Sequence, residues 1–172
     1  MSLSAHPAPR FGPTALPVER AGRGPRRTAP RTASLRLSGT GRGCAQAREF
    51  TDRTLGHWEL DQCRDDALTV ISELAANAML HARLCDATDD DEAVSEVWVK
   101  LTLRSAHLVC AVTDQSDSLP RCPDKVGPLQ EHGRGLLIVE ALSQHWGWTR
   151  YTPRGKTVWA MLPTGLSAEA CT

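Results

Sequence analysis

Three polar side chains follow one another at intervals of four residues in the segment Glu73-Leu-Ala-Ala-Asn77-Ala-Met-Leu-His81. On a helix, residues four apart share one face, so Glu73, Asn77 and His81 would form a polar stripe. A carboxylate and an amide oxygen at this spacing can complete the oxygen shell of a hard cation, and the carboxylate can also accept a proton. The alternative is an ordinary polar outer face, but the small alanines between these residues favour close approach of a neighbour or a ligand.

A second candidate is Asp114, which ends an apolar strand predicted over residues 108–113. The two-residue alternation of a strand places this carboxylate on the face of the strand's apolar residues, where an unpaired charge is costly. The amino group of an adenine is one candidate partner. The alternative is an aspartate that caps a turn together with Gln115 and Ser116.

A third candidate is the segment Gly133-Arg134-Gly135-Leu136, which begins a helix predicted to run to about His145. Glycines let the backbone approach a ligand closely, and the first N–H groups of a helix can bind phosphate. The preceding loop, residues 116–132, contains several prolines and no periodicity, and its length predicts a functional lid. A pair of glycines alone is weak evidence, because many such pairs only form turns.

Hydrophobic periodicity predicts the elements that would position these residues. Asp61 is the expected N-cap of the helix that carries the polar stripe, and Gly56 is expected to end the helix before it. Leu35 and Leu37 could belong to a short first strand. The remaining expected elements are helices over 44–55 and 61–82, strands over 94–103 and 108–113, and a hairpin of 148–151 with 156–162. Helices segregated from strands predict an α+β fold, a two-layer sandwich of a mixed, mainly antiparallel sheet with helices on one face.

The 172 residues suit one domain with a tail. We expect a disordered basic, proline-rich tail over residues 1–33, rather than a targeting peptide or a nucleic-acid-binding arm, a domain over 34–165 and a flexible end over 166–172. Lys and Arg total 20, as do Asp and Glu, so net charge gives no attraction to nucleic acid or to an anionic membrane. Six cysteines without a Cys-x-x-Cys pair predict reduced thiols in a cytoplasmic protein.

The order and spacing of the candidate motifs resemble those of the ATP-binding superfamily of gyrase, histidine kinases and bacterial heat-shock chaperones. Within it, the chain is most similar to the small anti-sigma-factor serine/threonine kinases. The resemblance covers about residues 34–163 and is carried by Ser-Glu-Leu-Ala-Ala-Asn-Ala-Met-Leu-His-Ala (72–82), Val-Thr-Asp (112–114), Gly-Arg-Gly-Leu-Leu-Ile-Val-Glu-Ala-Leu (133–142) and Trp-Gly-Trp…Gly-Lys-Thr-Val-Trp-Ala (146–160).

The resemblance implies a histidine-kinase-like ATPase fold that binds ATP with Mg²⁺. Asn77 would be the metal ligand, Glu73 the general base, and Asp114 the residue that reads adenine. One departure is Ser116, which stands where the family usually has the glycine of an Asp-x-Gly motif. The remaining residues implied to bind the nucleotide are His81, Arg83, Gly133, Arg134, Gly135, Leu136 and Thr157, the last as a hydroxyl beside adenine.

Two functions follow from the resemblance. The first is a serine/threonine protein kinase that phosphorylates an anti-anti-sigma (STAS-type) partner and sequesters a sigma factor, with a homodimer as one form of assembly. The alternative is a nucleotide-dependent protein-binding module with little or no kinase activity. Neither involves direct contact with nucleic acid or a membrane. Histidine-kinase activity is disfavoured, because about forty residues before the polar stripe cannot supply a dimerising helical hairpin as well.

Overall fold

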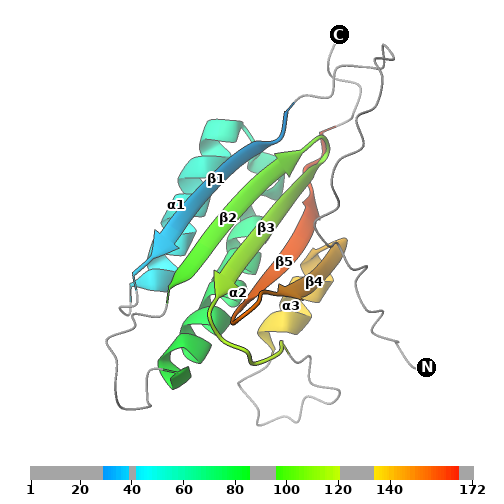
Figure 1. Ribbon diagram of the computed structural model, residues 1–172. Helices are drawn as coiled ribbons and strands as arrows, with labels where there is room; N and C mark the ends of the chain where they lie inside the picture. The colour runs from blue at the N-terminus through cyan, green and yellow to red at the C-terminus, as the bar shows by residue number, and fades with distance from the viewer. Residues whose placement is uncertain (1–28, 39–41, 86–95, 121–133, 167–172) are drawn as a thin grey trace, which may run out of the picture.

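The computed structural model describes residues 29–38, 42–85, 96–120 and 134–166 (Figure 1). These form one antiparallel sheet and a layer of helices, which is the α+β class expected. In chain order the elements are β1 (Arg31–Leu37), α1 (Gly43–Trp58), the 3-10 turn η1 (Asp61–Cys63), α2 (Arg64–Cys85), β2 (Val97–Arg104), β3 (His107–Asp114), α3 (Gly135–Leu142), β4 (His145–Arg150) and β5 (Lys156–Pro163).

The five strands lie in the order β1-β2-β3-β5-β4. All four pairings between these strands are antiparallel, so the described sheet is not mixed as expected. β5 is inserted between β3 and β4, and its first residue, Lys156, lies opposite the last residue of β3, Asp114. The β3–β5 pairing therefore brings two charged side chains to the same end of the sheet and, by alternation, to the same face.

The helices cover one face of the sheet, and no helix of the described residues lies on the other, here called the open face (Figure 1). Period-two alternation decides which strand residues meet the helices: Val97, Val99 and Leu101 of β2 are at most 1% exposed. Helix α2 lies at the centre of the layer and contributes Val70, Ile71, Leu74, Ala75 and Ala78 to the core. Among the described residues, no helix is long and apolar enough to cross a membrane.

Helix α1 passes through Gly56, the expected end, and stops at Trp58. Leu55 and Trp58 are both buried, so their packing holds the last turn in the helical conformation. Glu59 then takes the left-handed conformation that commonly ends a helix, with φ 59°. Asp61 is not the N-cap of α2, because residues 61–63 form a 3-10 turn before the α-helix begins.

The ends of two further elements differ from expectation. Helix α3 ends at Leu142, and Ser143 is extended. The reason is the pairing of β4 with β5, which begins at His145, three residues before the predicted strand. β1 begins at Arg31, inside the segment expected to be tail, because residues 31–34 pair with β2.

Candidate functional site

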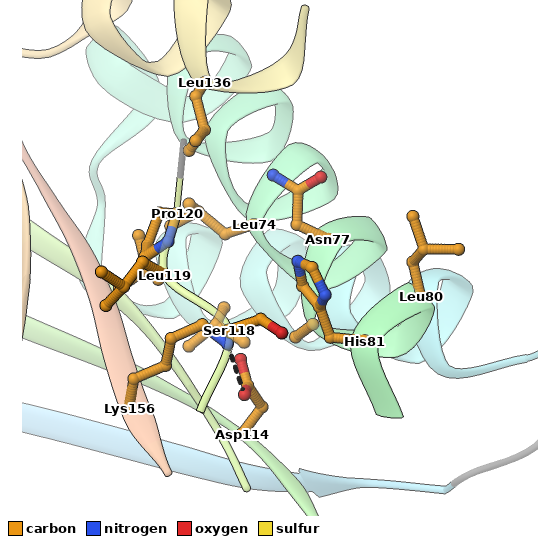
Figure 2. A pocket seen from close by; sticks show the side chains of 13 residues that line it. Leu74, Asn77, Leu80, His81, Asp114, Ser118, Leu119, Pro120, Leu136 and Lys156 are labelled. Atoms are coloured by element: carbon orange, nitrogen blue, oxygen red, sulfur yellow. Dashed lines mark hydrogen bonds and ion pairs between the residues drawn. The ribbon is translucent and has the colours of Figure 1, made fainter. Parts of the chain in front are cut away.

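A cavity of about 410 Å³ opens between α2, the end of β3, the start of β5, the start of α3 and residues 118–120 (Figure 2). Its walls are mainly apolar, with a few polar groups at defined places, which is typical of small-molecule sites. The polar side chains belong to Asn77, His81, Asp114, Ser118 and Lys156. The apolar lining residues are Leu74, Ala78, Leu80, Val112, Leu119, Pro120, Leu136 and Val158.

Two residues of the polar stripe, Asn77 and His81, line this cavity, whereas Glu73 is not among the lining residues. Figure 2 shows Asn77 and His81 on the α2 side of the cavity. Among the described residues, the Asn77 amide has no hydrogen-bond partner, which leaves its oxygen for a ligand. The predicted helix and the shared face of Asn77 and His81 are confirmed.

Glu73 lies one turn before Asn77 and meets the start of α3. A Cβ atom placed on Gly135 would lie only 2.5 Å from Oε2 of Glu73, closer than real Cβ contacts allow. The absence of a side chain at Gly135 therefore permits the carboxylate to touch the first residue of α3. Leu136 follows as a buried residue that lines the cavity, and Arg134 is exposed at the N-cap.

Two other predicted ligand residues cannot be placed. Gly133 lies outside the described residues, and so does most of the expected lid over 116–132. Arg83 belongs to the last turn of α2, but its side chain is outside the described part. From the expected lid, Ser118, Leu119 and Pro120 are described and line the cavity.

Asp114 is buried at the opposite end of the cavity from Leu136 (Figure 2) and is held by two contacts. Its Oδ1 accepts hydrogen bonds from Nζ of Lys156 and from the backbone N–H of Ser116, both at 2.8 Å. Both side chains of the ion pair are 3% exposed. The sequence alone predicted that this carboxylate needs a partner, and the structure supplies Lys156, which was not expected.

Ser116 stands where the resemblance leads us to expect a glycine. Its φ is not among the positive values found in the described residues, so this position does not require glycine. Its N–H bonds Asp114, its carbonyl accepts from Nζ of Lys156 at 3.3 Å, and its Oγ accepts from the N–H of Ser118 at 3.1 Å. Ser116 therefore belongs to the network of hydrogen bonds that holds Asp114 in place.

Thr157, which was expected beside adenine, is not among the residues that line the cavity. Its neighbours Lys156 and Val158 line the cavity, so alternation turns Thr157 to the open face of the sheet. There its Oγ1 is hydrogen-bonded to Oγ1 of Thr113 at 2.5 Å and donates to the hydroxyl of Tyr151 at 3.1 Å. The β5 residue that faces Asp114 is Lys156.

Gly155 fixes the approach of β5 to β3 at this end. Its φ is +106°, and a Cβ atom there would lie 2.6 Å from the carbonyl oxygen of Asp114. A side chain would therefore be both strained and blocked by backbone. This glycine allows Lys156, the next residue, to reach the carboxylate.

The surroundings of His81 favour its neutral form. Burial and the nearby Lys156 ammonium lower the pKa of His81, and the Asp114 carboxylate opposes them. The side chain thus lies within the electrostatic reach of the Asp114 end of the cavity.

The described residues fit a nucleotide with its metal. The Asn77 amide oxygen is the kind of ligand that Mg²⁺ prefers, and Mg²⁺ usually binds only one or two protein groups together with phosphates. No group of three or more His, Cys, Asp or Glu side chains able to hold a metal alone occurs among the residues described. A metal here would thus depend on phosphate oxygens.

The sheet topology and this cavity agree with comparison to known families. The profile of the histidine kinase-like ATPase domain matches residues 37–162, so the chain belongs to this family of ATP-binding domains. No curated protein matches the chain significantly.

Proposed function

We propose that the protein is an ATP-dependent serine/threonine kinase of the anti-sigma-factor type, acting on an anti-anti-sigma (STAS-type) protein and sequestering a sigma factor. One observation carries the proposal: a mainly apolar cavity is lined by a buried carboxylate, Asp114, at one end and by Asn77 of α2 and Leu136 of α3 toward the other. Glu73 does not line the cavity, but its carboxylate lies against Gly135, the residue before Leu136. This arrangement suits a ligand with a base at one end and anionic phosphates at the other.

Each group has a role in this scheme. Asp114 accepts a hydrogen bond from the base, and the apolar residues around it exclude water. The first N–H groups of α3 face the phosphates, and Arg134 at its N-cap adds positive charge. Asn77 would hold Mg²⁺, which would offset the phosphate charge. Glu73 accepts the proton of the attacking serine or threonine hydroxyl.

The test is incubation of the purified protein with γ-labelled ATP, Mg²⁺ and a purified STAS-domain protein. Label should move to a serine or threonine of the partner. Glu73→Ala should abolish transfer with ATP affinity nearly unchanged, and Asn77→Ala should also lose Mg²⁺-dependent binding. ATP binding without transfer to any partner would instead support the nucleotide-dependent binding module.

A further inference from the structure

The buried ion pair at the base end of the cavity has hydrogen-bonding capacity left over. An ammonium group has three N–H donors. Nζ of Lys156 gives one to Asp114 and one to the carbonyl of Ser116, which leaves one. Lys156 lines the cavity, so this third donor is available to a ligand there.

Asp114 has the complementary capacity. Both of its contacts with described residues fall on Oδ1. Oδ2 has no hydrogen-bond partner among the described residues. Every fully enclosed side-chain oxygen or nitrogen in the described part of the chain does have a partner, so Oδ2 is accessible from the cavity that Asp114 lines. The pair therefore presents an acceptor and a charged donor side by side within a mainly apolar wall.

We propose that Lys156 reads the purine base together with Asp114, a proposal that rests on the nucleotide binding proposed above. Oδ2 of Asp114 accepts from the exocyclic amino group of a 6-aminopurine, and Nζ of Lys156 donates to the adjacent ring nitrogen, N1. Adenine carries this donor and acceptor next to each other on its Watson–Crick edge, which proteins read by hydrogen bonds when a base is unpaired. A carboxylate alone would bind only the amino group.

This assignment makes Lys156 a specificity-determining residue. The donor is charged and the surrounding wall is apolar, so loss of the acceptor from the base would leave a buried N–H without a partner. The site should therefore distinguish adenine from an analogue in which N1 is replaced by C–H, although the two have the same shape and the same amino group.

The test compares the affinities of ATP and 1-deazaadenosine triphosphate, each with Mg²⁺, by calorimetry. The wild type should bind the analogue roughly tenfold or more weakly, as expected for loss of a charged hydrogen bond. Lys156→Met should reduce this ratio to nearly one. Lys100→Met is the matched control, because Lys100 is exposed on the open face of the sheet, and it should keep the wild-type ratio.

A general loss of affinity in a variant weakens ATP and the analogue equally, so it does not change the ratio of the two affinities. Lys156→Met leaves Asp114 without its counter-charge, so the ratio is also measured in Asp114→Asn/Lys156→Met, where both charges are removed and the ratio should again be near one. Equal affinities in the wild type, or an unchanged ratio in Lys156→Met, would overturn the assignment while leaving ATP binding intact. Failure of the wild type to bind ATP would overturn the proposed function together with it.

Discussion

Replacement of Gly135 by alanine should separate catalysis from stability. Gly135 is the first residue of α3, and its new Cβ would lie 2.5 Å from Oε2 of Glu73 but 3.5 Å from Cβ and Cδ of the same side chain. Only the carboxylate end has to move, and it belongs to a flexible side chain. The fold should tolerate the change, whereas the carboxylate should leave its position beside the α3 N-terminus.

Stability and turnover should change in opposite directions in Gly135→Ala. Alanine is favoured over glycine in a helix by about 0.5–1 kcal/mol in its interior and by less at an end, so the thermal midpoint should stay level or rise by about 2–4 °C at most. A misplacement of about 1 Å at a reacting group can cost about 100-fold in rate. We therefore expect phosphotransfer or ATP hydrolysis to fall by about that factor, with ATP affinity little changed.

The control is Gly56→Ala, since a Cβ on Gly56 of α1 would meet nothing within 4 Å. It should stabilise the fold similarly and leave turnover unchanged. Wild-type turnover in Gly135→Ala, or a loss of ATP affinity as large as the loss of turnover, would refute the assignment of Glu73 as the displaced group.

Three further predictions follow from the same contacts. Asp114→Asn and Lys156→Met should each cost about 3–5 kcal/mol in the free energy of unfolding, and the double variant should cost much less than their sum, as measured by urea denaturation; additive costs would contradict the pairing. Because the pKa of His81 is lowered in the folded state, the unfolded state binds more protons below about pH 6.5. The free energy of unfolding should therefore fall on acidification through that range, and it should fall less in His81→Gln. Deletion of residues 1–28 should change the thermal midpoint by only a few degrees, whereas deletion through Leu37 should be strongly destabilising, because it removes β1.

Periodicity predicted the elements well where one face is buried. The alternation of β2 and the helical spacing of α2 both describe a half-buried element, and the structure confirms the expected faces. The ends were harder to predict, because tertiary packing decides them. Trp58 holds α1 beyond a glycine that would end an isolated helix, and β5 draws residues from the end of the predicted α3 into β4.

Lys156 was missed although a usable signal existed. Val158, Ala160 and Leu162 are the buried residues of β5, so alternation alone places position 156 on their face and position 157 on the other. The family resemblance instead pointed to the hydroxyl of Thr157, which lies on the opposite face. The need of Asp114 for a partner was predictable from burial, but the identity of the partner depends on the β3–β5 register, which the sequence did not reveal.

The internal position of β5 has a consequence for folding during synthesis. The strand is made after every other described element, yet it lies between β3 and β4 and supplies Lys156 and Val158 to the cavity wall. A chain still emerging from the ribosome can form α1, α2 and the β1–β2–β3 sheet, but it lacks one side of the cavity. Affinity for the ligand would thus appear only when β5 has been made and paired. An incomplete chain would therefore not compete with finished molecules for nucleotide.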